Sequence, residues 1–502
     1  MAKLKLSQVK MGAFISYFAL GISIITGLLY TPWMVHQIGQ SNYGLYTLAT
    51  SLINIFLLDF GLGSAVSRFV AKYRAEQNQK AINSIVGVIY KLYITIDIIV
   101  LLILVGVYFF LDKIYVKLTP AELQQFRILY IMVAGFSLIS FPLSPLNGIL
   151  NAYEKFIQLK LCDLFNKLFT VGFVVIALSF SNSVTTVVAV NVISGIITLI
   201  IKLVIVRKNL PLRVDFNAGD KTLYKSLFGF TLWTTINSIM NRFTHSFAPS
   251  VLGMTSNSIE ISLYSPAVIL ESYFYMLATA VNGLFLPRVS KFIADKREDQ
   301  ILKLMIKVGR YQIVVLGLIF IGFLCVGQEF MTLWMGPEYA KTYYCALIII
   351  FPSLIACSQQ IANTTVIAKN LIKYQARCHI ITGIIGLAVS YITSIYLGAI
   401  GVCIGTAVTA LINTIYMNTV YHKKASINMF KFYKKTYLNA IPCYILVAVV
   451  CMALISFIPL GGWLGLTVKA AVITVIYCLV FALLYFSKEE KVVVLKRLKI
   501  IK

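Results

Sequence analysis

The chain alternates between long apolar runs and short polar segments. About 20 apolar residues with a rise of 1.5 Å each let a helix cross a hydrocarbon core of roughly 30 Å. When each apolar run of about this length is taken as one membrane-spanning helix, the pattern predicts an all-α membrane protein with about fourteen transmembrane helices. We expect them at residues 11–35, 43–66, 84–111, 125–151, 161–180, 184–206, 226–252, 259–287, 308–330, 343–367, 376–397, 400–421, 437–458 and 463–486.

The segment 39–80 shows the pattern most clearly. Its apolar part runs from Tyr43 to Val66 with a single ionisable side chain, Asp59. A basic amphipathic run follows, and such runs hold a helix end at the cytoplasmic face. This run carries Arg68, Lys72, Arg74 and Lys80.

The distribution of positive charge predicts the orientation. With the N-terminus inside, the inner segments hold 36 of the 44 lysines and arginines, and the outer loops hold Lys113, Lys117 and Lys341. One missed helix would invert every later loop and destroy this asymmetry. We therefore expect both termini in the cytoplasm.

Composition excludes several classes of protein. Apolar residues make up 59% of the 502, charged residues 12%, and the mean hydropathy is +0.86. A soluble fold of this composition would expose too much apolar surface. The net charge of +26 does not predict nucleic-acid binding, because the basic residues lie mostly in loops on one side. The nine cysteines form no CxxC pair, and the first apolar run is too long for a cleaved signal peptide.

A weak internal repeat divides the chain. Leu-Tyr pairs recur 218 residues apart, at Leu45 and Leu263, and Phe-Pro pairs recur 210 residues apart, at Phe141 and Phe351. Both offsets join helix n to helix n+6, so a six-plus-six duplication with two appended helices is expected. The predicted parts are an N-terminal six-helix lobe (1–210), a C-terminal six-helix lobe (211–425), and helices thirteen and fourteen with a basic tail (426–502).

The runs YGLY…LLDFGLGSAVSRFVAKY (43–73) and PRVSKF (287–292), with the long basic loop after helix six, resemble bacterial polysaccharide repeat-unit flippases of the O-antigen and capsule type. These belong to the MOP exporter superfamily, beside lipid II flippases and MATE antiporters. The resemblance implies two six-helix lobes around a central cavity that opens alternately to each side. It implies an undecaprenyl-pyrophosphate-linked oligosaccharide as substrate, a location in the bacterial cytoplasmic (inner) membrane, and a role in lipopolysaccharide or capsule synthesis. Membrane lipids, a polysaccharide polymerase and a chain-length regulator are the implied partners.

Charged side chains inside spans are costly, so each is a functional candidate. Arg242 and Glu271 lie about 15–18 Å from the outer ends of helices seven and eight. One interpretation is a cavity cation for the pyrophosphate, with Glu271 as its counter-ion or as a protonation site. The other is a structural ion pair within one lobe.

Lys91 and Lys167 lie about 10 Å from the inner ends of helices three and five, and Asp163 shares a helix face with Lys167. They could form a basic vestibule for an anionic headgroup, or extend to the interface. Asp97 is a candidate site for coupling to H⁺ or Na⁺, or a partner of Arg242.

Amides and a histidine complete the candidates. Asn237 and Asn241 could bind sugar hydroxyls or join helices. His245, one turn beyond Arg242, is a third coupling candidate or a structural histidine. The remaining residues are expected to serve structure or gating: Asp59, Gly61, Gly63, Arg68 and Arg288.

No signature of an enzyme is present. There is no P-loop, the histidines have no metal-ligand spacing, and the longest outer loop, 112–124, is too short for an outer catalytic site. We expect neither a metal nor another cofactor. A MATE-like drug or cation antiporter is the first rival hypothesis, which the membrane-embedded cations oppose. A glycan-assembly protein without transport activity is the second.

Overall fold

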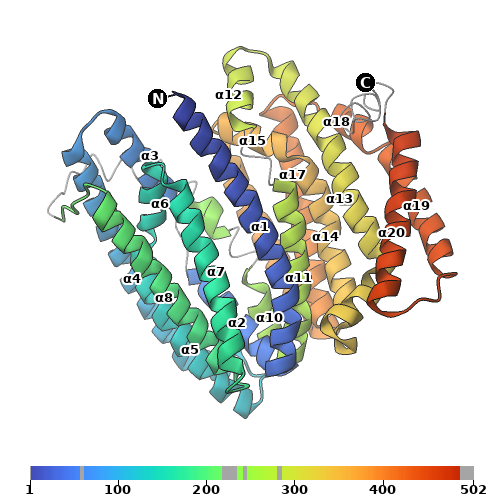
Figure 1. Ribbon diagram of the computed structural model, residues 1–502, viewed down its shortest axis with the longest axis horizontal. Helices are drawn as coiled ribbons and strands as arrows, with labels where there is room; N and C mark the ends of the chain where they lie inside the picture. The colour runs from blue at the N-terminus through green and yellow to red at the C-terminus, as the bar shows by residue number, and fades with distance from the viewer. Residues whose placement is uncertain (1, 57–61, 217–234, 241–245, 280–284, 487–502) are drawn as a thin grey trace. The chain divides into compact units, whose positions relative to one another are not determined.

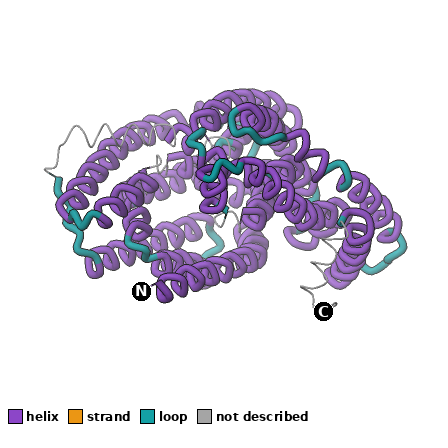
Figure 2. Tube along the Cα trace, turned by 90° about the horizontal axis from the view of Figure 1, so that it is seen from above, coloured by secondary structure: helices purple, strands orange, loops and turns teal. Residues whose placement is uncertain are grey.

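The computed structural model describes residues 2–56, 62–216, 235–240, 246–279 and 285–486. All regular structure in these ranges is helical (Figure 2). Among these residues nine helices are long and apolar enough to cross a membrane, and the number is ten if one bent pair of helices, α14 (Thr342–Ser358) and α15 (Gln360–Ala368), counts as a single span. The predicted all-α membrane fold is confirmed, whereas the number fourteen is not confirmed by the described residues.

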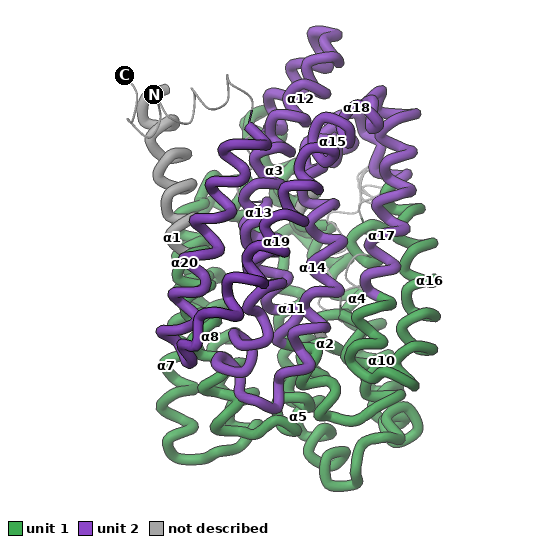
Figure 3. Tube along the Cα trace, turned by 90° about the vertical axis from the view of Figure 1, so that its right-hand side faces the viewer, with its two compact units in different colours: residues 1–265, 375–405 green, residues 266–374, 406–502 purple. Residues whose placement is uncertain are grey.

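The chain forms two compact units, coloured separately in Figure 3. Unit 1 comprises residues 1–265 and 375–405, and unit 2 comprises residues 266–374 and 406–502. The predicted lobes follow the sequence repeat, which is a different division, and they stay a prediction.

Unit 1 contains most of the first half of the chain. Figure 1 shows α4, α5, α7 and α8 packed side by side within it. Its elements are α1 (Ala2–Ile38), α2 (Gln40–Phe56), α3 (Leu62–Ala75), α4 (Gln79–Ile114), α5 (Pro120–Ser140), η1 (Phe141–Leu143), α6 (Pro145–Ala152), α7 (Phe156–Leu178), α8 (Val184–Asn209), α10 (Ala248–Thr255), the start of α11 (Ser258–Thr279), most of α16 (Ile372–Leu397) and the start of α17 (Ala399–Lys423).

One predicted span of unit 1 is not a continuous α-helix. The span expected at 125–151 changes to the 3₁₀ turn η1 after Ser140 and resumes as α6 at Pro145. Pro142 and Pro145 explain this break, because neither can donate the backbone N–H that a regular helix needs. The span expected at 43–66 includes residues 57–61, which lie outside the described residues, so its continuity stays a prediction.

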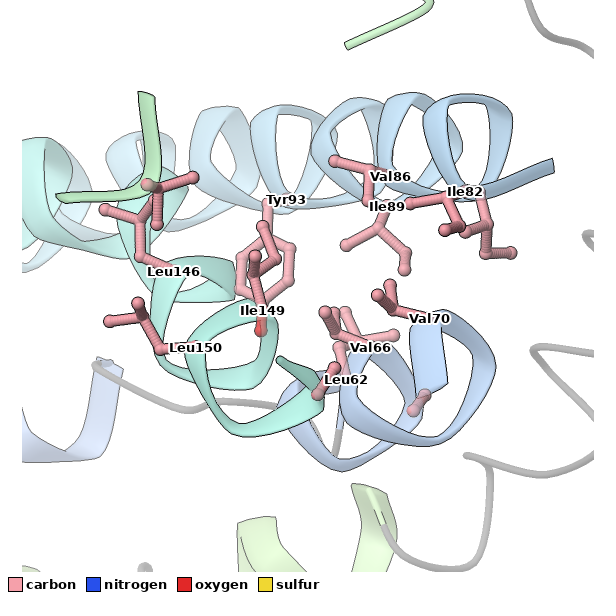
Figure 4. Close-up of a cluster of buried hydrophobic side chains, with 14 of the residues drawn as sticks. Leu62, Val66, Val70, Ile82, Val86, Ile89, Tyr93, Leu146, Ile149 and Leu150 are labelled. Atoms are coloured by element: carbon pink, nitrogen blue, oxygen red, sulfur yellow. The ribbon is translucent and has the colours of Figure 1, made fainter. Parts of the chain in front are cut away.

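The core of unit 1 lies where α3, α4 and α6 meet. Figure 4 shows Val66, Ile89 and Ile149 pointing toward one another from these three helices. A Cβ atom added to Gly148 would lie 2.6 Å from the carbonyl oxygen of Gly63, so α3 and α6 approach more closely than larger residues would allow. Lipid offers no hydrophobic drive for helices to associate, and small residues permit this close packing instead.

Unit 2 is built on the long helix α13. Its elements are the rest of α11, α12 (Leu286–Ala294), α13 (Glu298–Met335), η3 (Pro337–Tyr339), α14 (Thr342–Ser358), α15 (Gln360–Ala368), the rest of α17, α18 (Met429–Thr436), α19 (Ala440–Ile455), α20 (Gly462–Val480) and the π-helical turn η4 (Phe481–Tyr485).

A bend divides one span of unit 2. α14 and α15 meet at 56° with only Gln359 between them. The side-chain amide of Gln359 donates a hydrogen bond to the hydroxyl of Tyr433 in α18, and Asn418 of α17 donates to the same hydroxyl at 2.8 Å. The bend is therefore held by side chains from two other helices.

The last two helices pack on α13 through aromatic side chains. The hydroxyls of Tyr444 and Tyr477 donate to the carbonyl oxygens of Ile313 and Val314, at 2.7 and 2.8 Å. The rings of Tyr477 and Phe481 stack with their centroids 4.2 Å apart. α19 and α20 are thus part of the core of unit 2.

Candidate functional site

Helix α7 carries a polar face inside its membrane span. Asp163, Asn166, Lys167 and Thr170 follow the spacing i, i+3, i+4 and i+7, so they share one side of the helix. The hydroxyl of Thr170 donates to Asn166 Oδ1 at 3.1 Å. On the opposite side of α7 lie the exposed apolar residues Leu161, Phe165, Leu168 and Ile176.

The polar face therefore points away from the side of α7 that suits lipid. Its members are nevertheless not fully buried, and the side chain of Asp163 is 49% exposed. A half-exposed carboxylate opposite the apolar face needs a polar medium around it, because hydrocarbon disfavours an ionised group strongly.

A buried lysine from α8 holds Asp163. The Nζ atom of Lys202 lies 3.0 Å from Asp163 Oδ1 and donates to Asn147 Oδ1 of α6 at 3.1 Å, while its side chain is only 10% exposed. Asp163 was expected beside Lys167 on the same helix face, and the structure shows that its ion-pair partner is Lys202.

Lys167 is the second charged residue that α7 places on this polar face. Its side chain is half-buried, and it makes no hydrogen bond or ion pair with any other residue in the described ranges. An ammonium group in this position is a compact point charge that suits a phosphate oxygen.

Lys91 and Asp97 lie on different sides of α4. Lys91 shares its side with the exposed Ile98 and Leu102, and it takes part in an interaction within the chain. Asp97 shares its side with the buried Tyr93 and has a buried Oδ1 atom without a hydrogen-bond donor among the described residues. A carboxylate oxygen without a donor is expensive to keep ionised, so Asp97 remains a candidate for proton or cation coupling.

Glu271 lies in the part of α11 that belongs to unit 2. Its Oε1 atom accepts a hydrogen bond of 2.7 Å from the hydroxyl of Ser353 in α14. The predicted partner Arg242 lies outside the described residues, so the predicted pair stays a prediction.

Several predicted residues are only partly located. Asn241, His245, Asp59 and Gly61 also lie outside the described residues. Asn237 lies in the helical segment 235–240, and its buried Oδ1 atom has no hydrogen-bond partner in the described part of the chain.

Three of the residues predicted to serve structure or gating lie within the described ranges. Gly63 lies at the contact of α3 with α6. Arg68 is exposed on α3, and Arg288 is exposed on α12 with its guanidinium 5.5 Å from the ring centre of Phe292. Within the described ranges no three histidine, cysteine or acidic side chains gather as metal ligands would.

Sequence reasoning missed Lys202, which it counted among the loop charges at the end of the predicted helix 184–206. The signal was its setting, because apolar residues flank Lys202 on both sides in ITLIIKLVIV. Two further ion pairs join spans of unit 2. Lys369 meets Glu298 at 2.6 Å, and Lys469 meets Glu329 at 2.8 Å.

The long apolar helices of the described residues define a multi-pass membrane protein, and solved structures show the same fold. A lipid II flippase, MurJ, in an inward closed conformation matches with a TM-score of 0.70 and 13% identity, over 95% of this chain and 98% of that one. An inward-facing multidrug resistance MATE transporter of the MOP superfamily matches with a TM-score of 0.68 and 11% identity, over 82% of this chain and 98% of that one.

The chain belongs to the polysaccharide biosynthesis protein family, whose model matches residues 9–290. It is similar to the uncharacterized membrane protein EpsK of Bacillus subtilis, with 21% identity over 95% of each chain. A probable low-salt glycan biosynthesis flippase of Haloferax volcanii, Agl15, is 21% identical over 38% of this chain and 40% of its own. The expected resemblance to the flippases of the MOP superfamily is confirmed.

Proposed function

We propose that the chain is a flippase for an undecaprenyl-pyrophosphate-linked oligosaccharide repeat unit. It would move this lipid from the inner to the outer leaflet of a bacterial cytoplasmic membrane during synthesis of O-antigen or capsule. Both termini would lie in the cytoplasm, and a polymerase and a chain-length regulator would act on the product. The observation that carries the proposal is the polar face of α7, with Lys167 on it.

The physical obstacle to flipping is the headgroup. Each hydroxyl without a hydrogen bond costs several kcal/mol in hydrocarbon, and a diphosphate costs far more. A polar path with fixed lysines lowers this barrier while the polyprenyl chain stays in lipid. Asp163 and Lys202 neutralise each other, so Lys167 supplies the net positive charge of the polar face.

The driving force has two sources. An inside-negative membrane potential favours outward movement of an anion by about 2.3 kcal/mol per charge per 100 mV. Exchange for H⁺ or Na⁺ could add to it, with Asp97 and Glu271 as the described candidates and His245 as the third. No step of the proposed cycle makes or breaks a covalent bond, so the protein would not act as an enzyme.

Deletion of the gene tests the proposal. We expect the lipid-linked repeat unit to accumulate in the inner leaflet, where an impermeant glycan-modifying enzyme added outside the cell does not reach it. Accumulation in the outer leaflet would favour the glycan-assembly hypothesis. Normal surface glycan together with altered drug tolerance would favour the antiporter hypothesis.

A further inference from the structure

The ion pair of unit 1 lies between a buried ammonium group and the polar face of α7. Helices α7 and α8 pack side by side (Figure 1). The side chain of Lys202 on α8 is 10% exposed, whereas that of Asp163 on α7 is 49% exposed. The carboxylate is therefore the accessible member of the pair, and it separates the ammonium group of Lys202 from the polar medium at α7.

The ionised pair sets the net charge of this region. Asp163 contributes one negative charge, and Lys167 and Lys202 contribute one positive charge each, so the net charge is +1. A lipid-linked diphosphate whose two phosphates are both diesters carries two negative charges at neutral pH. Addition of one proton to Asp163 changes the net charge of the region to +2, which equals the charge of the diphosphate in magnitude.

The hydrogen bonds of Lys202 allow it to change partner. Its Nζ atom donates to Asn147 Oδ1 of α6 at 3.1 Å as well as to Asp163 Oδ1 at 3.0 Å. An ammonium group has three N–H donors, so one donor remains beyond these two bonds. If Asp163 becomes neutral, Asn147 still accepts from Lys202, and the buried ammonium keeps a polar partner.

Asp163 is the only acidic residue on the helices that pack together here. α7 packs on α1, α6 and α8, and the sequences of these four helices contain no other aspartate or glutamate. Their other ionisable residues are Lys3, Lys5, Lys10, Tyr17, Tyr30 and His36 on α1, Lys160, Cys162 and Lys167 on α7, and Lys202, Arg207 and Lys208 on α8. Only His36 among these ordinarily titrates near neutral pH, and it is exposed in the last turn of α1.

We propose that Lys202 is a second phosphate ligand, which Asp163 occupies in the absence of substrate. The diphosphate binds Lys167 and Lys202 together, and Asp163 takes up one proton from water as it gives up its cation. The diphosphate disfavours an ionised carboxylate beside it, because like charges repel. This inference rests on the proposed function, and it explains how the same site accommodates two phosphates.

Calorimetry on the purified protein in detergent measures the proton. The probe is farnesyl diphosphate joined to N-acetylglucosamine, whose phosphates are both diesters and take up no proton near neutral pH. Titrations in buffers of different ionisation heat should show uptake of about one proton for each probe molecule bound. The affinity for the probe should correspondingly weaken by about tenfold for each pH unit over which this uptake occurs.

Asp163→Asn assigns the proton to its residue. The amide resembles a protonated carboxyl group, so this variant should bind the probe more tightly than the unmodified protein at neutral pH. Its binding should take up no proton and should depend little on pH. The control is His36→Gln, which removes the exposed histidine of α1 and should keep the full proton uptake.

The role of Lys202 is tested in the same background. Asp163→Asn with Lys202→Gln should bind the probe about tenfold more weakly than Asp163→Asn alone, because the diphosphate loses a charged donor. The matched control is Asp163→Asn with Lys208→Gln, since Lys208 is an exposed lysine in the last turn of the same helix. This control should bind as tightly as Asp163→Asn.

The results separate this inference from the proposed function. If the folded, unmodified protein does not bind the probe, the proposed function fails and the inference fails with it. Binding without proton uptake by the unmodified protein would overturn the inference alone, and this measurement needs no substitution. Equal affinity of Asp163→Asn with and without Lys202→Gln would also overturn it, while the flippase function would stand.

Discussion

Lys202 Nζ lies 3.0 Å from Asp163 Oδ1, and the two residues come from neighbouring spans 39 positions apart. Asn147 completes the arrangement from a third helix. The pair removes one positive and one negative charge from the interior of unit 1 and fixes α6, α7 and α8 together. It leaves Lys167 as the cation of the polar face whose charge no described residue neutralises.

Lys202→Met should destabilise the protein by about 1–3 kcal/mol. The substitution leaves Asp163 without its cation, and the half exposure of Asp163 reduces the cost below that of a fully buried pair. Thermal unfolding in detergent measures the change. The double variant Lys202→Met with Asp163→Asn should recover part of the lost stability, because the carboxylate of Asp163 is then no longer present without its cation.

The control for that measurement is Lys303→Met. Lys303 pairs with Asp299 at 3.5 Å, and both side chains are more than 60% exposed, at 70% and 64%. Such pairs contribute about 0–1 kcal/mol. An equal loss of stability in both variants would show that the pair of Lys202 and Asp163 contributes no more to stability than an exposed surface pair does.

Lys167→Gln should lower the rate of glycolipid export by about tenfold without changing the amount of protein in the membrane. Hydrogen bonds to charged groups contribute about 1.5–3 kcal/mol, and the glutamine keeps only a neutral donor. Lys160→Gln, on an exposed position of the same helix, should have no effect. Export at the normal rate in Lys167→Gln would remove this residue from the site.

Charge reversal of Arg242, by Arg242→Glu, should abolish export while the protein still inserts. A carboxylate at mid-membrane depth would repel the pyrophosphate that the arginine is predicted to attract. Normal insertion is checked by membrane fractionation, and export by the exposure of the glycan at the cell surface. A variant that exports normally would contradict the predicted cation site.

Asp97→Asn and Glu271→Gln separate the two described candidates for coupling. If a carboxylate carries the coupling proton, its amide variant should still bind substrate but lose the response of transport to an imposed pH gradient. Transport into proteoliposomes with and without the gradient measures this. Glu338→Gln, an exposed acid in η3, should keep the full response. A full response in both membrane variants would exclude these two residues.

Gly44→Ala should lower the thermal stability of unit 1 by about 1–3 kcal/mol, because the new methyl group would lie 1.9 Å from the carbonyl oxygen of Ser258. Gly106→Ala in α4 is the matched control, since nothing lies within 4 Å of its added methyl group. The control should be neutral or slightly stabilising, as alanine favours helix over glycine. Equal stability of the two variants would show that α2 and α11 separate easily in solution.

Hydropathy predicted the spans well where they are unbroken. The helix expected at 376–397 is α16, Ile372–Leu397, and that expected at 400–421 is α17, Ala399–Lys423. The reason is physical, since a backbone in hydrocarbon must satisfy its hydrogen bonds within its own segment. The same reasoning cannot detect a break, because an apolar run has the same composition whether it is straight or bent. The bend before α15 was missed for that reason.

The candidate site was predicted less completely, because ion pairs between spans depend on three-dimensional packing. Spacing alone placed Asp163 beside Lys167, whereas the partner of Asp163 comes from another helix. Glu122 was taken for a residue of an outer loop, and its bonds to Ser41 and Ser258 link segments more than 80 residues away. Sequence showed which charges lie inside the spans, and only the fold shows which of them meet.

The bend between α14 and α15 is connected by hydrogen bonds to two later helices, α17 and α18. One phenol oxygen, on Tyr433, receives a hydrogen bond from the residue at the bend and another from α17. The bend is therefore held partly by a short amphipathic helix, α18, more than 70 residues later in the chain. Inherited changes in α18 should alter the course of α15 as well, so these two segments are expected to evolve together.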